Sequence, residues 1–397
     1  MRNIIITGGE LFNKGAQAMT FVTVHELKKR FPEHEIYLLS EMDRQRPEAE
    51  KEQYAFSFTG WYPIKFARCQ HNQALRLACL LRNKKELKEC EDLYKNCDLM
   101  VDISGYGLGS NWDLNQLNTY LDHLEYAKAF GIPCYLMPQS FGPFVFSGDK
   151  KAIGERLPEL LRSVKCICAR EKEGYDSLVA EYGLQNVSLF PDLVLNNKGI
   201  ELSRIYRGTP VICLPSIEEN SVGIVPNVRT TEFIGRGALL SLYRDCISWL
   251  LEKGKRVYLL THSTDDRSLC REISDLFCEN NGVVFLAQDF SCIEYSEIVK
   301  RFDYVIASRY HSIIHAYKNC IPCISIGWAE KYNTLLRSFG QGQYCFDLRE
   351  TESAEKIVSA LEQMDAKRLF EAEKIKNYLH QVQEHNVFDI LGSELPE

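Results

Sequence analysis

Short apolar runs alternate along the chain with longer stretches in which apolar residues recur at helical spacing. The first run, 3–7 ("NIIIT"), is followed by an amphipathic stretch at 16–31 and by a second apolar run at 35–39. The two runs predict buried strands, and the stretch between them predicts a helix. Because a strand, a helix and a strand in succession form a right-handed crossover, we expect the chain to begin with a parallel sheet.

The same alternation continues in two series, which an irregular stretch separates. Residues 197–220 lack periodicity, and a second series of strands and helices begins at 221. We therefore predict an α/β protein with two Rossmann-like domains, 1–205 and 206–397, that face each other across a cleft. The stretch 353–385 predicts a helix that packs across both domains. In such sheets ligands bind at the carboxyl ends of the strands, so the loops after strands are the candidate sites.

Composition supports a soluble globular protein and removes some classes of function. Of the 397 residues, 45% are apolar and 25% are charged, and the formal charge is −7. Such a chain has no basic field for a nucleic-acid backbone, so nucleic acid is not an expected partner. The N-terminal apolar run is too short for a secretory signal, which predicts a cytoplasmic protein. The 15 cysteines are scattered through apolar runs, which favours buried free thiols.

Loops of the first domain contain candidate polar residues but no nucleotide-binding motif. The loop at 8–15 lacks both the G-x-G-x-x-G and the P-loop patterns. Asn13 and Gln17 lie at the start of the helix that follows, where they either contact a ligand in the cleft or cap the helix. Gln139 follows another strand and either binds substrate or belongs to a structural turn.

Arg170 ends the apolar run "CICA" and precedes a helical stretch. If the run is a strand, the guanidinium points into the cleft, where its planar shape suits a carboxylate or a phosphate. An ion pair with Glu171 or Glu173 is the structural alternative.

The strongest candidates follow strands of the second domain. Asn227 and Arg229 lie in the loop after its first strand, Arg309 and His311 come directly after the run "YVIA", and Lys331 follows "CISIGW". Together with Arg170, which is expected on the opposite wall of the cleft, these cations would form a positive pocket in a protein of net negative charge. Such a pocket favours a small, highly anionic substrate.

Three nearby residues resemble metal or redox sites at first sight. His315 lies four residues after His311, on the same face of a helix, but no third ligand or H-E-x-x-H pattern accompanies the pair. Cys320 and Cys323 have redox-motif spacing but lead into a strand instead of a helix. We therefore predict no metal site and interpret these side chains as packing behind the cleft.

An ordered set of short motifs resembles the polysaccharide pyruvyl transferase family. The motifs are "NKGAQAM", "DISGYG", "PQSFGPF", "ARE", "PDLVL", "PNVR" and above all "SRYHSIIHAYKNCIPCISIGWAEKYN". The resemblance covers most of the chain and implies a glycosyltransferase-B-like pair of Rossmann-type domains with phosphoenolpyruvate in the cleft. The chain departs from the family pattern in two places. Ala16 and Gln17 stand where many members carry acidic residues, and Ile321 stands where a glycine is usual.

The resemblance implies that the enolpyruvyl unit of phosphoenolpyruvate is moved onto a sugar as a pyruvate ketal, with release of phosphate. Carried over to this chain, Arg170, Arg309, His311 and Lys331 surround the carboxylate and phosphate of this donor substrate. Because an unperturbed histidine titrates near neutral pH, His311 is expected to act as acid or base, with a hydrogen bond to the phosphate as its alternative role. No cofactor is expected, because these cations neutralise the phosphate.

The acceptor implied by the resemblance is a sugar of a cell-surface polysaccharide or of its lipid-linked precursor. The aromatic and basic stretch 58–82 then either touches such a carrier at the inner face of the membrane or forms a buried helix with a solvated face. The sequence identifies neither the acceptor sugar nor the oligomeric state.

Two other functions stay open. A glycosyltransferase of the same architecture that uses a nucleotide-sugar donor needs a carboxylate for the ribose, and Asp265 and Asp266 are the candidates. A non-catalytic saccharide-binding protein of the same fold is the second alternative, which four cationic residues at strand ends do not favour.

Overall fold

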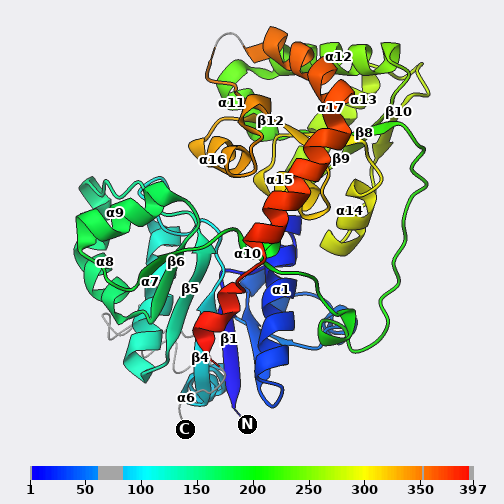
Figure 1. Cartoon of the computed structure of the whole chain (residues 1–397). Helices are drawn as coiled ribbons and strands as arrows, with labels where there is room; N and C mark the ends of the chain where they lie inside the picture. The colour runs from blue at the N-terminus through cyan, green and yellow to red at the C-terminus, as the bar shows by residue number, and fades with distance from the viewer. Residues whose placement is uncertain (1, 61–83, 351–352, 393–397) are drawn as a thin grey trace.

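The computed structural model describes residues 2–60, 84–350 and 353–392, which form two parallel sheets covered by helices (Figure 1). The first sheet has the strand order β3-β2-β1-β4-β5-β6-β7. Its strands are β1 (Asn3–Thr7), β2 (Glu35–Leu39), β3 (Ser57–Thr59), β4 (Cys97–Asp102), β5 (Cys134–Gln139), β6 (Cys166–Ala169) and β7 (Val187–Leu189). The helices of this part are α1 (Lys14–Arg30), α2 (Glu41–Arg44), α3 (Glu48–Lys51), α6 (Lys84–Lys95), α7 (Leu114–Phe130), α8 (Lys151–Ser163), α9 (Lys172–Tyr182) and α10 (Leu193–Asn196).

The second sheet has the strand order β10-β9-β8-β11-β12-β13. Its strands are β8 (Ser221–Val225), β9 (Arg256–Leu260), β10 (Val283–Leu286), β11 (Tyr304–Ala307), β12 (Cys323–Gly327) and β13 (Cys345–Asp347). The helices of this part are α11 (Thr231–Ile234), α12 (Arg236–Glu252), α13 (Arg267–Asp275), α14 (Cys292–Val299), α15 (Tyr310–Lys318), α16 (Glu330–Ser338) and α17 (Ser353–Val382).

Both sheets have the strand order of a doubly wound Rossmann domain. The paired strands are parallel throughout, and the order reverses between β1 and β4 in the first sheet and between β8 and β11 in the second. The carboxyl ends of strands at such a reversal leave a crevice that binds ligands. The prediction of an α/β protein with two Rossmann-like domains is therefore confirmed.

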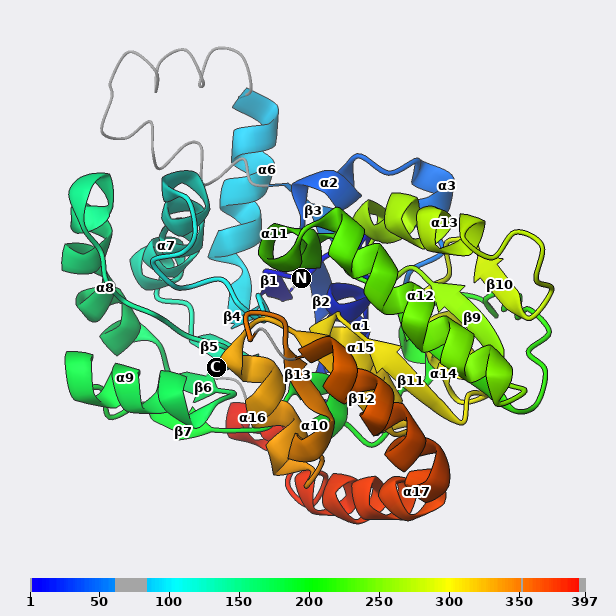
Figure 2. The same ribbon diagram turned by 90° about the horizontal axis from the view of Figure 1, so that it is seen from above.

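The local sequence explains how α7 is placed on the first sheet. The Asp113 carboxylate caps the helix by accepting the backbone N–H of Gln116, and Gly131, at φ 68°, ends it in the left-handed conformation. Leu117, Leu121 and Leu124 recur at helical spacing and are buried. Helices α7, α8 and α9 lie together on one side of the molecule, away from α12 and α13 (Figures 1 and 2). One face of α7 therefore stays available for contacts outside the sheet.

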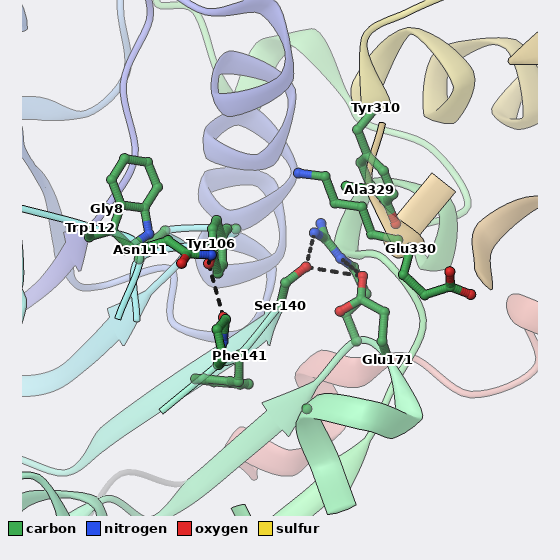
Figure 3. A pocket seen from close by; sticks show the side chains of 18 of the residues that line it. Gly8, Tyr106, Asn111, Trp112, Ser140, Phe141, Glu171, Tyr310, Ala329 and Glu330 are labelled. Atoms are coloured by element: carbon green, nitrogen blue, oxygen red, sulfur yellow. Dashed lines mark hydrogen bonds and ion pairs between the residues drawn. The ribbon is translucent and has the colours of Figure 1, made fainter. Parts of the chain in front are cut away.

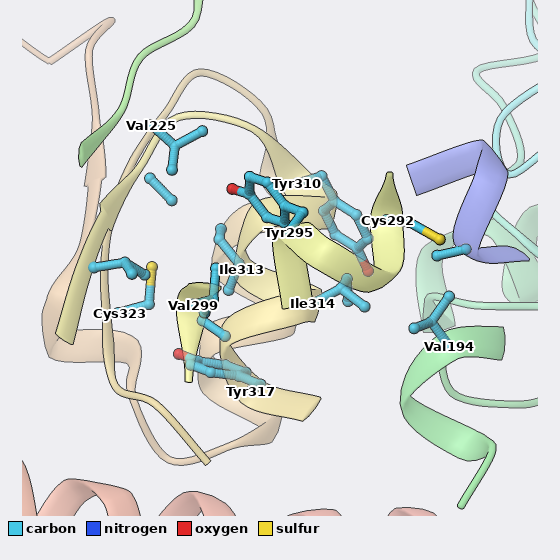
Figure 4. Packing of buried hydrophobic residues seen from close by; sticks show 14 of the residues in the cluster. Val194, Val225, Cys292, Tyr295, Val299, Tyr310, Ile313, Ile314, Tyr317 and Cys323 are labelled. Carbon is cyan, nitrogen blue, oxygen red and sulfur yellow. The ribbon is translucent and has the colours of Figure 1, made fainter. Parts of the chain in front are cut away.

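A continuous apolar cluster joins the two domains. It includes Phe21 of α1 and Val194 of α10 together with Ile314 and Tyr317 of α15, and Figure 4 shows Val194 on the first-domain side of this packing. Polar contacts add to it, because the side-chain oxygen of Gln17 accepts the backbone N–H of Cys292 at 2.6 Å. Buried apolar surface of this kind stabilises one arrangement of the two domains.

The C-terminal end of the chain returns to the first domain. Helix α17 crosses from the second domain towards the first (Figure 1), and the 3₁₀ turn Val387–Leu391 follows it. The side-chain amide of Asn196 donates to the carbonyls of Val382 and His385 at 2.8 and 2.7 Å. Arg30 also forms an ion pair with Asp389 at 2.6 Å. Two crossings of the chain, one at 207–220 and one at α17, therefore connect the domains.

Candidate active site in the interdomain cleft

A cleft of about 1200 Å³ lies between the carboxyl edges of the two sheets. Its walls come mainly from the loops after strands, as Figure 3 shows for Gly8, Ser140, Phe141 and Glu171 of the first domain and Tyr310 of the second. The predicted residues on its lining are Asn13, Arg170, Asn227, Arg229, Arg309, His311 and Lys331. The cleft therefore lies where the doubly wound sheets concentrate their ligand-binding edges.

Arg309 directly follows β11 and is held by a buried carboxylate. Its Nε and Nη2 atoms donate to the two oxygens of Asp266 at 2.9 and 2.6 Å. Asp266 is fully buried and also accepts the backbone N–H of Val228 at 3.0 Å. A two-point pair of this geometry fixes the guanidinium plane at the cleft wall. It also engages Asp266, one of the two carboxylates considered from the sequence for the ribose of a nucleotide-sugar donor.

Lys331 lies in the first turn of α16, directly beyond β12, and three tyrosines surround its ammonium group. Its Nζ atom is 5.7 Å from the ring centroid of Tyr106, 5.5 Å from that of Tyr310 and 5.9 Å from that of Tyr332. We call these three rings the tyrosine cage. Tyr106 comes from the first domain and the other two from the second, so the cage closes across the cleft.

The surroundings of Lys331 favour loss of its proton. Burial lowers its pKa to about 8, and the positive charges of Arg170, Arg229 and Arg309 act in the same direction, against the opposing effect of Glu171. No carboxylate forms an ion pair with Lys331 in the part of the chain that the structure describes. A lysine with such a pKa is still mostly protonated at pH 7 but gives up its proton far more readily than an exposed one.

Arg170 follows β6, and its side chain forms hydrogen bonds to partners of its own domain. Its Nε donates to Glu171 at 2.9 Å, its Nη1 to Asp192 at 2.9 Å and its Nη2 to the Ser140 hydroxyl at 2.6 Å. The guanidinium also lies over the Tyr310 ring, 4.4 Å from its centroid. The pairing with Glu171 expected as the structural alternative is confirmed. Arg170 therefore orients the cleft wall and supports Tyr310, while its charge is offset by two carboxylates.

His311 lies in the first turn of α15 (Tyr310–Lys318) and packs against the first turn of α1. A Cβ atom at Gly15 would lie 2.3 Å from the His311 ring, so only glycine fits there without movement. The His311 Nε2 atom is 3.9 Å from the Asp192 carboxylate, which is beyond hydrogen-bond distance. The imidazole therefore lies in the contact between the two domains.

The electrostatics of His311 differ from those predicted. Burial lowers its pKa to about 4, Arg170 and Lys331 add to the lowering, and Asp192 opposes it. At neutral pH the imidazole is therefore uncharged. The expectation that His311 titrates near pH 7 is not met, because that expectation assumed an unburied ring.

Two further histidines lie behind His311. The ring centroid of His262, which follows β9, is 6.4 Å from that of His311 and 6.2 Å from that of His315. Burial lowers the pKa of His262 and takes that of His315 to about 3. His315 is buried, as interpreted from the sequence. Within residues 2–60, 84–350 and 353–392, no group of three His, Cys, Asp or Glu side chains is arranged to hold a metal ion.

The expected cleft residues Asn13, Asn227 and Arg229 line the cavity in different ways. The Asn13 side chain caps α1 by accepting the backbone N–H of Gly15 at 2.8 Å. The Asn227 amide donates to the carbonyl of Ser308 at 3.1 Å and its oxygen accepts the N–H of Arg229 at 3.0 Å. Both asparagines therefore shape the backbone of the cleft, whereas the side chain of Arg229 is exposed at its edge.

Gln17 and Gln139 are not part of the cleft lining, contrary to the prediction. Gln17 is buried and holds α14 through the N–H of Cys292. Gln139 is fully buried at the end of β5, where its amide donates to Asp102 at 3.0 Å and its oxygen accepts the Tyr120 hydroxyl at 3.2 Å. Polar side chains at strand ends therefore serve the scaffold wherever a buried partner is within reach.

Several residues of the site were not singled out from the sequence. The tyrosine cage, the stacked rings of Phe233 and Trp328 at 5.7 Å, and Glu10 all line the cleft or its edge. Burial raises the pKa of Glu10, and the nearby Asp43 adds to this effect. The aromatic residues of "SGYGLGSNW" and "GWAEKY" follow predicted strands. The rule that ligands bind beyond strand ends could therefore have identified them as candidates from the sequence.

Two Rossmann-type domains with a cleft between their carboxyl edges define the glycosyltransferase-B architecture. Solved structures share it: Medicago truncatula UGT71G1 complexed with UDP-glucose has a TM-score of 0.57 at 12% identity, with 99% of this chain and 96% of that chain covered. UDP-GlcNAc 2-epimerase from Methanocaldococcus jannaschii has a TM-score of 0.56 at 12% identity, with 91% and 92% covered. At this identity the likeness shows the fold alone.

The amino-acid sequence identifies the family of this chain within the glycosyltransferase-B architecture. The family model for polysaccharide pyruvyl transferase matches residues 13–330. The chain therefore belongs to the polysaccharide pyruvyl transferase family, as the motifs predicted. Lys331 lies one residue beyond the matched range. A comparison with curated protein sequences finds no significant match.

Proposed function

We propose that the protein transfers the pyruvyl unit of phosphoenolpyruvate to two hydroxyl groups of a saccharide, forming a cyclic ketal and releasing phosphate. The observation that carries this proposal is the group of cations on the second-domain wall of the cleft: Arg229, Arg309, Lys331 and Arg349. In the described residues Arg309 and Arg349 are each paired with a carboxylate, whereas no ion pair is found for Arg229 or Lys331. A small donor with both a carboxylate and a phosphate is the substrate class that would neutralise the other two.

The chemistry requires a proton donor for the methylene carbon of the donor. Lys331, with a pKa of about 8, still holds its proton at pH 7 and is matched to donation at that pH. His311, with a pKa of about 4, is neutral and therefore suited to accept a proton instead of donating one. We assign the acid to Lys331 and the base to His311, which revises the role that the sequence suggested for the histidine.

In the proposed reaction every proton given up by the enzyme is returned to it. Lys331 protonates the methylene carbon, and the first sugar hydroxyl attacks the neighbouring carbon while His311 takes its proton. The C–O bond to the phosphate then breaks, the second hydroxyl closes the ring, and its proton leaves with the phosphate. The proton on His311 returns to Lys331 in the resting enzyme. Arg309 holds the carboxylate or phosphate throughout, since its plane is fixed by Asp266.

The donor can be tested before the acceptor is known. Calorimetric titration of the protein with phosphoenolpyruvate and, separately, with UDP and UDP-glucose measures which ligand the cleft takes. We expect saturable binding of phosphoenolpyruvate that weakens at least about tenfold in Arg309→Ala, because a charged hydrogen-bonding partner is lost. The decisive assay then adds lipid-linked oligosaccharides and measures phosphate release together with an acid-labile ketal. Binding of UDP-glucose alone would contradict the proposal.

A nucleotide-sugar glycosyltransferase is the second candidate, because structures such as UGT71G1 with UDP-glucose share the fold. The site favours it less. Asp266 is engaged by Arg309, and Asp265 is exposed and outside the cleft lining. A protein that only binds saccharide needs no acid or base, and retention of full saccharide binding with no phosphate release would favour that third function.

The link to a membrane-bound carrier is also a proposal. Most of the stretch 58–82, which the sequence suggested as a carrier contact, lies outside the described residues. Among the residues that are described, no helix is both long enough and apolar enough to cross a bilayer. Peripheral contact with a lipid-linked acceptor is part of this proposal.

A further inference from the structure

The first-domain side of the cleft continues beyond the tyrosine cage as a groove between α7 and α9. On α7 the groove is lined by Asn115, Gln116, Thr119 and His123, whose helical spacing places them on one side of the helix, and Trp112 adds to the lining from the loop before it. This face is polar, whereas the face of α7 that packs on the sheet is formed by buried leucines. The Thr119 hydroxyl donates to the carbonyl of Asn115 at 2.9 Å, and Gln116 adds an exposed amide to the lining, so this wall of the cleft is polar and uncharged.

Helix α9 supplies the other wall. Glu173, Ser177 and Glu181 line the cavity at a spacing of four residues, and the loop that contains Phe144 and Val145 closes the groove between the helices. Val145 is 76% exposed, which places an apolar rim at the entrance. Between positions 173 and 181 the helix rises by about 12 Å, so the wall is longer than one sugar ring.

The charges divide sharply between the two sides of the cleft. The lining cations Arg229, Arg309, Lys331 and Arg349 all come from the second domain, where Arg309 and Arg349 are paired with carboxylates. On the groove side the described lining contains one cation, Arg170, which two carboxylates offset. The groove is therefore neutral to acidic, and an anionic ligand on this side would face glutamates without compensating cations.

Two aromatic rings mark the path from the groove to the proposed donor site. Tyr106 and Trp112 lie 5.4 Å apart, and Figure 3 shows them with Asn111 on the side of the pocket opposite Tyr310. The Tyr106 hydroxyl donates to the carbonyl of Gly142 at 2.9 Å, which fixes its ring. The Tyr106 ring belongs to both the groove and the tyrosine cage around Lys331. A sugar placed on Tyr106 would therefore reach the reacting atoms while its neighbour lies on Trp112.

From this arrangement we propose that the groove between α7 and α9 binds the uncharged sugar units next to the one that is pyruvylated, so that the acceptor is a neutral oligosaccharide of more than one ring. That this ligand is the acceptor of the reaction rests on the proposed function. The groove itself and the neutral saccharide as its ligand are inferred independently of that function. A diphosphate-linked carrier attached to such an acceptor would have to point away from α9, because Glu173 and Glu181 line that wall.

The test uses the full chain, labelled and saturated with phosphoenolpyruvate, on an array of oligosaccharides that are neutral or carry uronate or phosphate groups. Ser177→Lys places a positive charge in the groove, and Ala180→Lys places the same charge on an exposed, non-lining position of α9. We expect the wild type and Ala180→Lys to retain neutral oligosaccharides. Ser177→Lys and Trp112→Ala should each lose about tenfold or more in apparent affinity.

Calorimetry with phosphoenolpyruvate on the same proteins separates the two claims. Neutral oligosaccharides bound by a protein that fails to bind phosphoenolpyruvate would support the groove and contradict the donor. The groove is refuted by preferential retention of acidic sugars, by retention of no neutral sugar, or by undiminished binding in both Ser177→Lys and Trp112→Ala. Circular dichroism of each variant confirms that a lost signal does not come from unfolding.

Discussion

Replacing Lys331 by arginine separates the charge of this side chain from its acidity. Both side chains are cationic and both can contact the faces of the tyrosine cage. Arginine, however, keeps its proton at every accessible pH. If Lys331 only neutralises phosphate, Lys331→Arg should keep most of the activity. If it donates the proton, as proposed, kcat should fall by about 10²- to 10⁴-fold, the range measured for positioned acids and bases.

The pH dependence of kcat/KM gives a second, quantitative test of Lys331 as the proton donor. With a pKa of about 8, Lys331 is about nine-tenths protonated at pH 7 and about one-tenth protonated at pH 9. The proton-donating form therefore decreases about tenfold across this interval, and kcat/KM should fall with it, since this parameter reports the free enzyme. The residual activity of Lys331→Arg should not show this fall.

The assay is phosphate release from phosphoenolpyruvate in the presence of lipid-linked oligosaccharides, followed from pH 6 to pH 10. Lys318→Arg is the matched control, because burial also lowers the pKa of Lys318 to about 8 but this lysine is not part of the cleft lining. Its profile should match that of the wild type. Glu10→Gln tests a carboxyl group of the cleft whose pKa burial raises. Activity of Lys331→Arg within about fivefold of the wild type, or loss of the alkaline fall in Glu10→Gln instead, would refute the assignment.

Two further predictions concern the domain contact. Gly15→Ala should lower the melting temperature and kcat/KM together, because the new Cβ would lie 2.3 Å from His311 and overpacking costs about 1–3 kcal/mol; a raised melting temperature, as expected from helix propensity alone, would contradict the contact. The lowered pKa of His311 means that no stability is lost above pH 6.5 and that stability decreases as the pH falls towards 4, by about 2 kcal/mol at pH 5 from this group alone. Urea unfolding at pH 7.5 and pH 5 measures this decrease in the free energy of unfolding. In His311→Asn the decrease should be smaller by about 2 kcal/mol. An unchanged decrease in the variant would show that folding does not lower the pKa of His311.

Much of the fold follows from the sequence because buried parallel strands and amphipathic helices have strong local patterns. The helix predicted at 353–385 is observed as α17 at Ser353–Val382. The strands β3 and β13, in contrast, have three residues each and are only half-buried, so neither forms the apolar run that identifies a strand. Edge strands of this length are defined by pairing with a neighbour, which is a tertiary property.

The site was predictable in position but not in its electrostatics. The rule that ligands bind beyond strand ends selected Arg309, His311 and Lys331, and all three line the cleft. What the rule does not give is the set of partners from distant parts of the chain. Asp266 lies 43 positions before Arg309, and Asp192 belongs to the other domain from His311. These contacts decide which charges remain for a ligand and which are neutralised. Burial, the main cause of the lowered pKa values of His311 and Lys331, is likewise a tertiary property.

The origin of the tyrosine cage in two domains ties the acidity of Lys331 to the closure of the molecule. If the domains moved apart, Tyr106 and Arg170 would leave the lysine, while Tyr310 and Arg309 would stay with it. Water would then reach the ammonium group, and its pKa would rise towards the ordinary 10.5. The lysine would thus be a poor proton donor in the open protein and an effective one in the closed protein. Such a coupling would make proton donation by Lys331 depend on the contact between the two domains.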